Sequence, residues 1–510
     1  MPEQSWGEGY VVDVDYTHGY YRDLAPELLR FVALLGGARA AEIEPAFTYY
    51  ELGCGHGFST ALHAAANPSG QFIGADFNPS HIQSAQLLAR DAGIGNVRFL
   101  EKSFAELLET DLPDAEIIGM HGVWTWVGDE QRRQIVEFIR RRLKPGGLVY
   151  LSYNCLPGLA QVAPLQRLLA EHAALGAGDR MEQVRRSIDF AARLEKAGAK
   201  YFTSSPFARM RLQSIGTQNP HYVAHEYYNA NWTLQYHADV ARALAAAKLG
   251  FIGSTALLDN FDQFVLAPEA AKLLAELKDR AIVETAKDFM RNQVFRKDVF
   301  ARGAPQATPA ELAALLGRTR FALARPRSRC ALTGSTPAGE VALVAEAYAP
   351  VLDALARAPM TFDELAHAPE AAALDRNRLR QAVFGMAALG NLLPALPAAG
   401  EEARRAATRR FNRAILAAPA QGPADSVLAS PVLGCGVFVH FIDRLFLEAP
   451  PDEQQAAAHV EAIAAKRGLK LAKGKEFVES EGSTREVLAG RARFFFQELL
   501  PFYRQLGVLD

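Results

Sequence analysis

Cysteine is scarce in this sequence. The chain has four cysteines in 510 residues, at positions 54, 155, 330 and 435, without CxxC spacing and without a nearby pair of histidines. Structural zinc sites and disulfide frameworks both depend on clustered cysteines. The sequence therefore predicts no metal site and no disulfide framework, and the four residues are interpreted as reduced thiols.

An excess of charge of either sign is also missing. Lysine and arginine total 55 and aspartate and glutamate total 57, so the formal net charge is −2 and the isoelectric point is near 6.7. A protein that holds nucleic acid or an anionic membrane usually presents a strong positive field to it. Nucleic acid is therefore not expected as a partner.

Long hydrophobic runs are absent as well. No segment has 18 uninterrupted apolar residues, and the opening MPEQSWGEGYVVDVDY has neither a basic region nor an apolar stretch. Membrane-spanning helices and secretory leaders require those features. Because 49% of the residues are nevertheless hydrophobic and 22% are charged, the sequence predicts a folded, cytoplasmic protein of several domains with no membrane span.

What the sequence does contain is a glycine turn, in the stretch FTYYELGCGHG from 47 to 57. Strand-forming residues lead to an acid, glycines follow at every second position, and a helix-compatible run begins at Ser59. Glycine lets the backbone approach a ligand closely because no Cβ fills the space. The pattern predicts a strand, a ligand-binding turn and a helix. The residues assigned to the ligand are Glu51, Gly53, Gly55 and Gly57.

The spacing of the glycines bears on the identity of that ligand. In a dinucleotide fingerprint the third glycine would stand where this chain has Phe58, so NAD is disfavoured. The run ELGCGHG instead resembles the first motif of class I methyltransferases that depend on S-adenosylmethionine (SAM). This resemblance implies SAM as the cofactor.

An acid ends the next predicted strand. QFIGADF, residues 71–77, is a short apolar run in which Asp76 stands 25 positions after Glu51. A carboxylate at the carboxyl end of the second strand is placed to accept hydrogen bonds from both hydroxyls of a ribose. Asp76 is therefore predicted to bind the cofactor, with Phe77 beside it.

The third and fourth strands are predicted at 96–103 and 115–123. Many class I methyltransferases place an aspartate at the end of the third strand to hold adenine. This chain has Ser103 and Phe104 there, and Phe104 is expected to stack on the ring. The fourth strand ends in His121, Trp124 and Trp126. His121 is assigned to the cofactor and Trp124 to the methyl acceptor; the alternative is that these aromatic side chains only seal the domain.

Later runs sharpen the resemblance: HGVWTWV, KPGGLVYLSYN, HEYYNANW (225–232) and FMRNQVFRKDVF (289–300). They are similar to a bacterial family that joins a class I methyltransferase core to a methyltransferase regulatory domain. That family includes rickettsial-type protein lysine methyltransferases that act on outer-membrane proteins. The likeness extends from about residue 10 to 450. It implies an enzyme that transfers a methyl group from SAM to a protein substrate.

The fold class is predicted to be α/β. Strands and helices alternate through residue 154, which indicates parallel βαβ units with right-handed crossovers. FIGSTALLD and FDQFVL, at 251–259 and 261–266, are expected to supply the last strands, so that the core closes near residue 268. The resemblance implies a Rossmann-like methyltransferase core with a mostly parallel seven-stranded sheet, a helical insert and mainly α-helical C-terminal domains.

Three parts of the chain are expected. Residues 1–270 form the SAM-binding core, with a helical insert at about 158–222 that covers the acceptor site or makes a homodimer contact. Residues 271–400 form the regulatory domain, in part winged-helix-like, with Thr361 capping a short helix. Residues 401–510 form a helical C-terminal domain.

Tyr153 and Asn154, at the end of the fifth strand, are predicted to orient the methyl acceptor; the alternative is structural hydrogen bonding. A lysine amine is protonated at neutral pH unless its site disfavours the charged form. Aromatic walls exclude water and also attract ammonium groups. The candidates for such walls are Trp124, Trp126, Tyr153 and Tyr228. A small molecule or lipid would suit the same pocket, and a regulatory protein that binds SAM without turnover is a further alternative.

Tyrosine is dense before the first predicted strand. Residues 10–21 hold four of them. Tyr16, Tyr20 and Tyr21 are expected either to pack at the edge of the sheet or to form a lid over the cofactor.

Overall fold

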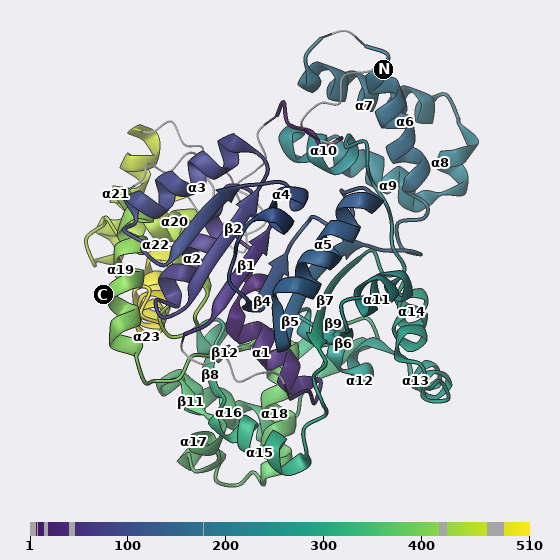
Figure 1. The fold of residues 1–510 in the computed structure, drawn as a ribbon. Helices are drawn as coiled ribbons and strands as arrows, with labels where there is room; N and C mark the ends of the chain where they lie inside the picture. Colours follow the sequence, from purple (N-terminus) through teal and green to yellow (C-terminus); the bar gives the residue numbers. More distant parts are fainter. Residues whose placement is uncertain are drawn as a thin grey trace.

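The computed structural model describes residues 7, 9–14, 19–39, 46–176, 178–417, 426–466 and 484–509. At its centre is a seven-stranded sheet in the order β3-β2-β1-β4-β5-β7-β6, in which β7 alone runs antiparallel to its neighbours (Figure 1). The strands are β1 (Thr48–Leu52), β2 (Gln71–Asp76), β3 (Val97–Glu101), β4 (Ala115–Met120), β5 (Leu143–Asn154), β6 (Leu249–Ser254) and β7 (Phe295–Arg302). The predicted mostly parallel, Rossmann-like sheet is confirmed.

The strand order reverses between β1 and β4, which are direct neighbours although two strands separate them in sequence. In open parallel sheets, ligands bind outside the carboxyl ends of the strands at such a reversal. The glycine turn follows β1, so the fold brings it to the edge of this crevice.

Helices cover both faces of the sheet. One face packs against α4 (Phe104–Glu109), α5 (Asp129–Arg142) and α11 (His237–Ala245), through a cluster that includes Tyr50, Ile118 and Phe138. The other face packs against α1 (Pro26–Leu35), α2 (Phe58–Ala66) and α3 (Pro79–Asp91). Because neighbouring strand residues point to opposite faces, Tyr49 and Tyr50 enter different clusters.

The last strand of the sheet comes from a different segment than predicted. FIGSTALLD does contribute to β6, but FDQFVL forms the short helix α12 (Asp262–Val265) after the turn η2 (Leu257–Asn260). The missing strand is β7, inside the run 289–300 and its continuation to Arg302. Its pattern FRKDVFAR includes buried charged residues, Arg296 and Asp298, so it does not read as an apolar strand. The sheet therefore extends past the expected boundary at 270.

A group of helices follows β5 and forms its own apolar cluster, at the upper right of Figure 1. The predicted helical insert is confirmed. Its helices are α6 (Ala163–Ala174), α7 (Arg180–Lys196), α8 (Lys200–Ser204), α9 (Pro206–Ile215) and α10 (Pro220–Tyr227).

The segment after the sheet contains the predicted helix, turn, helix and strand. Thr361 forms a capping box with Glu364 at the start of α17 (Phe362–Ala366), and α18 (Arg376–Ala388) leads into β12 (Leu392–Ala395). β12 and β11 (Met360–Thr361) flank β8 (Arg320–Leu323) in a three-stranded antiparallel sheet. The remaining elements between 268 and 371 are α13 (Pro268–Ala275), α14 (Arg280–Arg291), α15 (Pro309–Arg318), η3 (Arg327–Arg329), β9 (Thr333–Thr336), β10 (Gly339–Ala342), α16 (Ala345–Arg357) and η4 (Pro369–Ala371).

The C-terminal part is mainly α-helical, as predicted, with one antiparallel strand pair. Its elements are α19 (Glu401–Ala417), β13 (Ser426–Ala429), β14 (Gly436–Val439), α20 (Phe441–Phe446), α21 (Glu453–Lys466), α22 (Thr484–Phe494), the π-helical turn η5 (Phe495–Leu499) and α23 (Leu500–Gln505). They lie at the left of Figure 1, beside α2 and α3.

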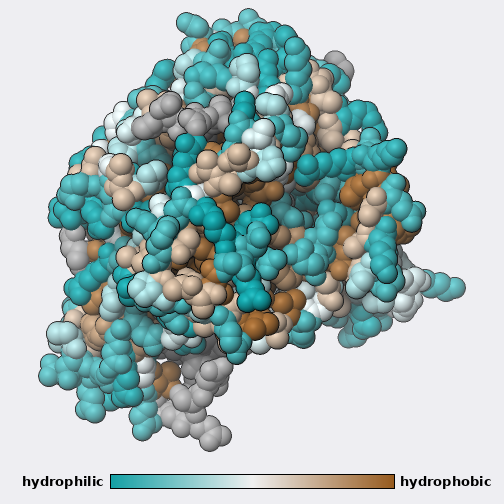
Figure 2. All heavy atoms as spheres, turned by 90° about the horizontal axis from the view of Figure 1, so that it is seen from below, coloured by the Kyte–Doolittle hydropathy of each residue, from teal (hydrophilic) through white to brown (hydrophobic). Residues whose placement is uncertain are grey.

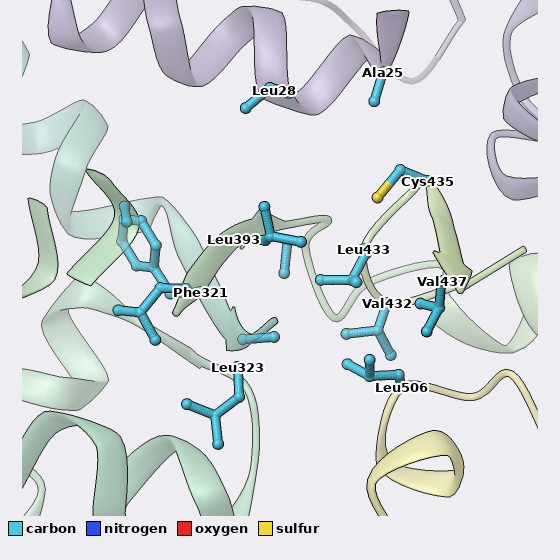
Figure 3. Packing of buried hydrophobic residues seen from close by; sticks show 14 of the residues in the cluster. Ala25, Leu28, Phe321, Leu323, Leu393, Val432, Leu433, Cys435, Val437 and Leu506 are labelled. Atoms are coloured by element: carbon cyan, nitrogen blue, oxygen red, sulfur yellow. The ribbon is translucent and has the colours of Figure 1, made fainter. Parts of the chain in front are cut away.

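One hydrophobic cluster joins the sheet to these later segments. Figure 3 shows Ala25, directly before α1, and Leu28 of α1 above Phe321 and Leu393 of the small sheet. Val432, Leu433, Val437 and Leu506 of the C-terminal part lie beside them. Leu28 is 6% exposed and Phe321 is fully buried. The segments after β7 therefore complete the core of the protein, because they cover apolar surface that α1 and the sheet would otherwise expose to water.

Candidate active site

The glycine turn has the backbone geometry that only glycine adopts easily. Gly53, Gly55 and Gly57 have φ angles of +70°, +53° and +68°. A Cβ at Gly53 would meet Val123 Cγ2 at 2.5 Å, and one at Gly57 would meet Ala85 Cβ at 2.5 Å. A Cβ at Gly55 would meet nothing within 4 Å. The protein thus packs tightly around the outer two glycines and leaves open space above the middle one.

That open space belongs to a cavity of about 640 Å³ at the carboxyl ends of β1 to β4. Every residue assigned to the cofactor from the sequence lies on its wall: Glu51, Gly53, Gly55, Gly57, Asp76, Phe77, Ser103, Phe104 and His121. Further lining comes from the N-terminal segment, with Tyr10 and Tyr21, and from the stretch 126–128. The volume falls within the range of about 300–1,000 Å³ typical of small-molecule sites.

Asp76 ties the ends of β1 and β2 together. Its Oδ2 accepts a hydrogen bond of 2.9 Å from the amide of Gly55, and its Oδ1 accepts one of 2.9 Å from the amide of Asn78. His81 Nδ1 lies 3.3 Å from Oδ1. The carboxylate therefore shapes the glycine turn besides facing the cavity, a second role that the sequence pattern did not indicate.

Glu51 lies beneath the turn and is 4% exposed. Thr60 Oγ1 donates to its Oε2 at 2.5 Å. Burial raises the pKa of Glu51 to about 8, although the bond from Thr60 acts in the opposite direction. The side chain is therefore a neutral carboxylic acid at neutral pH.

Ser103 and Phe104 meet the cavity at the end of β3, and Ser103 is also the N-cap of α4. Its hydroxyl accepts from the amide of Glu106, while its own amide donates to Glu106 Oε2 at 2.8 Å. These backbone and side-chain bonds from Ser103 lower the pKa of Glu106. Because the helix cap uses the polar groups of Ser103, the half-buried ring of Phe104 is the better candidate for contact with adenine.

His121 stands at the end of β4 between two tyrosine rings. Its Nδ1 lies 2.8 Å from the hydroxyl of Tyr150, and its ring stacks on Tyr21 with 3.8 Å between centroids. Burial lowers the pKa of His121 to about 4, with the neighbouring charges of Asp23 and Lys297 acting in opposite directions. The imidazole is neutral at physiological pH.

Several residues predicted for the acceptor do not line this cavity. The side chain of Tyr153 is buried on the face of the sheet that α5 and α11 cover, and its hydroxyl donates to Asp298 Oδ2 at 2.6 Å. Trp124 is 1% exposed and lies in the same apolar cluster. The amide of Asn154 donates to Thr125 Oγ1 at 2.8 Å, and Tyr228 bonds Ser187 inside the insert. The contacts of Tyr153 and Asn154 match the alternative of structural hydrogen bonding, and the packing of Trp124 matches the alternative of an aromatic side chain that seals the domain. Among the four predicted walls, only Trp126 lies on the cavity.

The side of the strand explains this correction for Tyr153. Alternate residues of a strand point to opposite faces, and the position of Tyr153 in β5 directs its side chain into the cluster with α5 and α11. Trp126, in contrast, lies beyond the end of β4 and stacks on Trp232, with 6.4 Å between ring centroids.

Tyr10 is a cavity residue that the site prediction missed. The segment 9–14 is held by the stretch 225–230: the amide of Val11 donates to Asn229 Oδ1 at 2.8 Å, and the amide of Ala230 donates to the carbonyl of Gly9 at 2.8 Å. Tyr10 then meets Phe77 edge-on, with 6.1 Å between centroids. The sequence signal available was the density of tyrosine before β1; the contact of this segment with the run HEYYNANW became visible only in the structure.

The three tyrosines considered for a lid have different positions. Tyr21 lies on the cavity. Tyr20 instead packs against His63 and accepts a hydrogen bond of 2.6 Å from the amide of Gly436, so it belongs to the core. Tyr16 lies outside the described residues.

Within the part of the chain that the structure describes, no group of three or more histidine, cysteine, aspartate or glutamate side chains could hold a metal ion. The four cysteines are buried free thiols. None of the helices described is long and apolar enough to cross a membrane.

Comparison with known families gives two matches. Residues 50–147 match a methyltransferase domain, and residues 219–302 match a predicted methyltransferase regulatory domain. The first match begins inside β1 and includes the glycine turn and β2 to β4. The second match includes α10, α11, β6 and β7. It therefore crosses the expected boundary at residue 270 between the core and the regulatory domain. The division at 270 and 400 remains a prediction.

The whole chain is similar to the uncharacterized protein sll1526 of Synechocystis, with 36% identity over 504 residues that cover 99% of this chain and 100% of the relative. The fold of this chain is similar to that of PKMT2 of Rickettsia typhi, whose structure is a complex with AdoHcy. That comparison has a TM-score of 0.69 and 20% identity, and it covers 97% of this chain and 99% of the other.

Proposed function

The chain belongs to the family of class I SAM-dependent methyltransferases that carry a methyltransferase regulatory domain, and on this premise we propose that it methylates the side-chain amine of lysine in a protein. The observation that carries this choice of acceptor is the aromatic wall of the cavity, formed by Tyr10, Tyr21 and Trp126. Aromatic faces attract ammonium groups, and a site that excludes water disfavours the charged form of an amine.

The cavity fits SAM in shape and in the chemistry of its wall. The open space above Gly55 admits a ligand against the backbone, and Asp76 stands at the end of β2, where a ribose is held in such sheets. SAM supplies a methyl group activated by a positively charged sulfur. We therefore propose that the glycine turn and Asp76 bind the cofactor, and that Phe77 and Phe104 contact its adenine.

A labelling experiment tests the choice of acceptor. The full chain is incubated with methyl-labelled SAM and a cell extract, which is then separated into protein, lipid and small-molecule fractions. We expect label in the protein fraction, and a rate that rises between about pH 7 and 9 because the acceptor must lose a proton from a group with an ordinary pKa near 10.4. Label confined to lipids or metabolites would refute the lysine proposal.

Glu51 gives a prediction about proton linkage. Since the pKa of Glu51 is about 8, the side chain carries a proton at pH 7. SAM carries positive charge, and a cation next to a buried carboxyl favours its ionised form. We expect SAM binding at pH 7 to release a proton and Glu51→Gln to abolish that release. Calorimetric titration in phosphate and in Tris measures it, because these buffers differ in ionisation enthalpy; an equal proton release in the variant would contradict the prediction.

We also propose that two copies of the chain pair through α14. This helix has an inverted pattern: it buries Glu284, Lys287 and Asp288 and exposes Ile282, Phe289 and Met290 by 50%, 58% and 46%. Ile282 and Phe289 are seven positions apart, so they lie on one side of the helix. Leu273 of α13 and Leu277 just after it are also exposed, by 54% and 40%. Figure 2 shows hydrophobic side chains at the right, where α13 and α14 lie.

An apolar row on one helix can pack against its own copy about a twofold axis, which makes a second copy the simplest partner. We expect light scattering to give the mass of a dimer for the wild-type chain and of a monomer for Phe289→Glu. Leu87→Glu is the matched control, because Leu87 is 41% exposed on α3. A wild-type chain that is monomeric at micromolar concentration, or a Leu87→Glu variant that also dissociates, would contradict pairing through α14.

A further inference from the structure

The position of His121 relative to the cofactor follows from the order of the strands. Asp76 ends β2, and Phe104 follows β3, so the ribose and adenine are expected over the β2 and β3 side of the cavity. SAM is an elongated molecule. Its sulfur end must therefore extend the other way, past the glycine turn of β1 toward β4. His121 directly follows the end of β4 and lies on the cavity wall there.

The surroundings of His121 fix its ring and leave one nitrogen available. Nδ1 bonds the Tyr150 hydroxyl at 2.8 Å, and the stacked Tyr21 ring holds the imidazole plane. Nε2 makes no hydrogen bond to any described residue, and it is not fully buried. Nε2 is therefore in contact with accessible space, and the space next to His121 is the cavity.

We propose that Nε2 of His121 accepts a hydrogen bond from the acceptor amine and aims its lone pair at the methyl carbon; this proposal rests on the proposed lysine acceptor. The ammonium first loses a proton to water. The neutral amine then donates one N–H to Nε2, its lone pair forms the new N–C bond, and the C–S bond breaks with its electron pair left on sulfur. The methylated amine carries the positive charge and loses a proton to water after release.

The charge state of His121 agrees with this role. The proposal requires the neutral tautomer in which Nδ1–H is donated to the hydroxyl of Tyr150, because that tautomer presents a lone pair at Nε2. The charged and titratable groups that face the ring are Asp23 and Lys297, which pair with each other at 2.8 Å, together with Tyr21 and Tyr150. Asp23 favours the protonated imidazole and Lys297 disfavours it, but burial has the largest effect, and the resulting pKa of about 4 keeps the ring neutral throughout the working range.

His121→Asn tests the proposal, because asparagine retains a polar group near the position of Nδ1 and lacks one at Nε2. We expect the rate of methyl transfer at saturating SAM to fall about 100-fold, as for a misplaced acceptor. The affinity for S-adenosylhomocysteine should stay within about twofold of wild type. His367→Asn, at the exposed residue that directly follows α17, is the matched control and should change neither quantity.

A binding measurement complements the rates. Protein with nitrogen-15-labelled histidine is prepared as the S-adenosylhomocysteine complex at pH 9. Addition of n-butylamine, which reproduces the four-carbon chain and amine of lysine, should shift the Nε2 signal of His121 in the nitrogen NMR spectrum. A rate within threefold of wild type, no shift of the signal, or a loss of S-adenosylhomocysteine affinity as large as the loss of rate would overturn the proposal. Label that appears only in lipids or metabolites would refute the lysine acceptor but not the contact of His121 with the group that is methylated.

Discussion

Gly55→Ala is expected to weaken the binding of S-adenosylhomocysteine at least about 100-fold, equivalent to about 2.7 kcal/mol. The reason is local: the space above Gly55 contains no protein atom within 4 Å of a Cβ, so the methyl group would occupy the volume into which a ligand must come. The amide of Gly55 itself is also the donor to Asp76 Oδ2. Calorimetric titration of the full chain measures the change.

The matched control is Gly303→Ala. Gly303 also has a positive φ, +57°, and open space around its Cβ position, but it lies after β7 and outside the cavity wall. Both variants bear a similar backbone strain of about 1–2 kcal/mol, so their free energies of unfolding should fall by similar amounts. Only Gly55→Ala should lose affinity. Equal affinity in the two variants would show that the ligand does not lie against the glycine turn.

Asp298→Ala is expected to lower the free energy of unfolding by about 3–5 kcal/mol, as when a buried ion pair loses one partner. Asp298 is 1% exposed and accepts bonds from Arg296 Nε at 2.9 Å, from Tyr153 at 2.6 Å and from His237 at 2.9 Å. Removal of the carboxylate leaves these buried donors without this hydrogen-bond acceptor. Urea denaturation measures the loss, and Asp91→Ala, in an exposed pair with Arg90, should stay within about 0.5 kcal/mol.

The same carboxylate sets a dependence on pH. Burial would raise the pKa of Asp298, but the charge of Arg296 and the bond from His237 outweigh it and lower the pKa to about 2. A depressed pKa means that the carboxylate stabilises the fold above its ordinary pKa near 3.9 and loses that contribution as the pH falls toward 2. The difference in stability between wild type and Asp298→Ala should therefore shrink across that interval. A constant difference would contradict the role given to its ionised form.

The cofactor side of the site was predictable because its signals are local. The glycine turn and Asp76 each stand at the end of a strand that an apolar run reveals, and parallel strands bring their carboxyl ends to one edge. The acceptor side depends on long-range contacts. Tyr10 reaches the cavity because Asn229 and Ala230 hold its neighbours Val11 and Gly9 in place. Asn229 is 218 residues away from Val11 in the sequence. No periodicity in either segment encodes that pairing.

Charge patterning concealed the other feature that sequence reasoning missed. β7 lies between β5 and β6 although it carries Arg296 and Asp298, because Arg296 forms buried ion pairs with Asp288 of α14 and with Asp298 of the same strand. A buried strand whose charged residues are paired with a helix does not appear in the sequence as an apolar run. α14 shows the complementary pattern, with its charged side chains buried and its apolar ones exposed.

The position of the transferred methyl group tests the proposed function most directly. Protein labelled by the full chain and methyl-labelled SAM is digested, and tandem mass spectrometry locates the label within each peptide. We predict methyl groups on the side-chain nitrogen of lysine, in amounts that fall together with the transfer rate in His121→Asn. Methyl groups on arginine, on a carboxylate or on a chain terminus, with unmodified lysines in the same peptides, would contradict it.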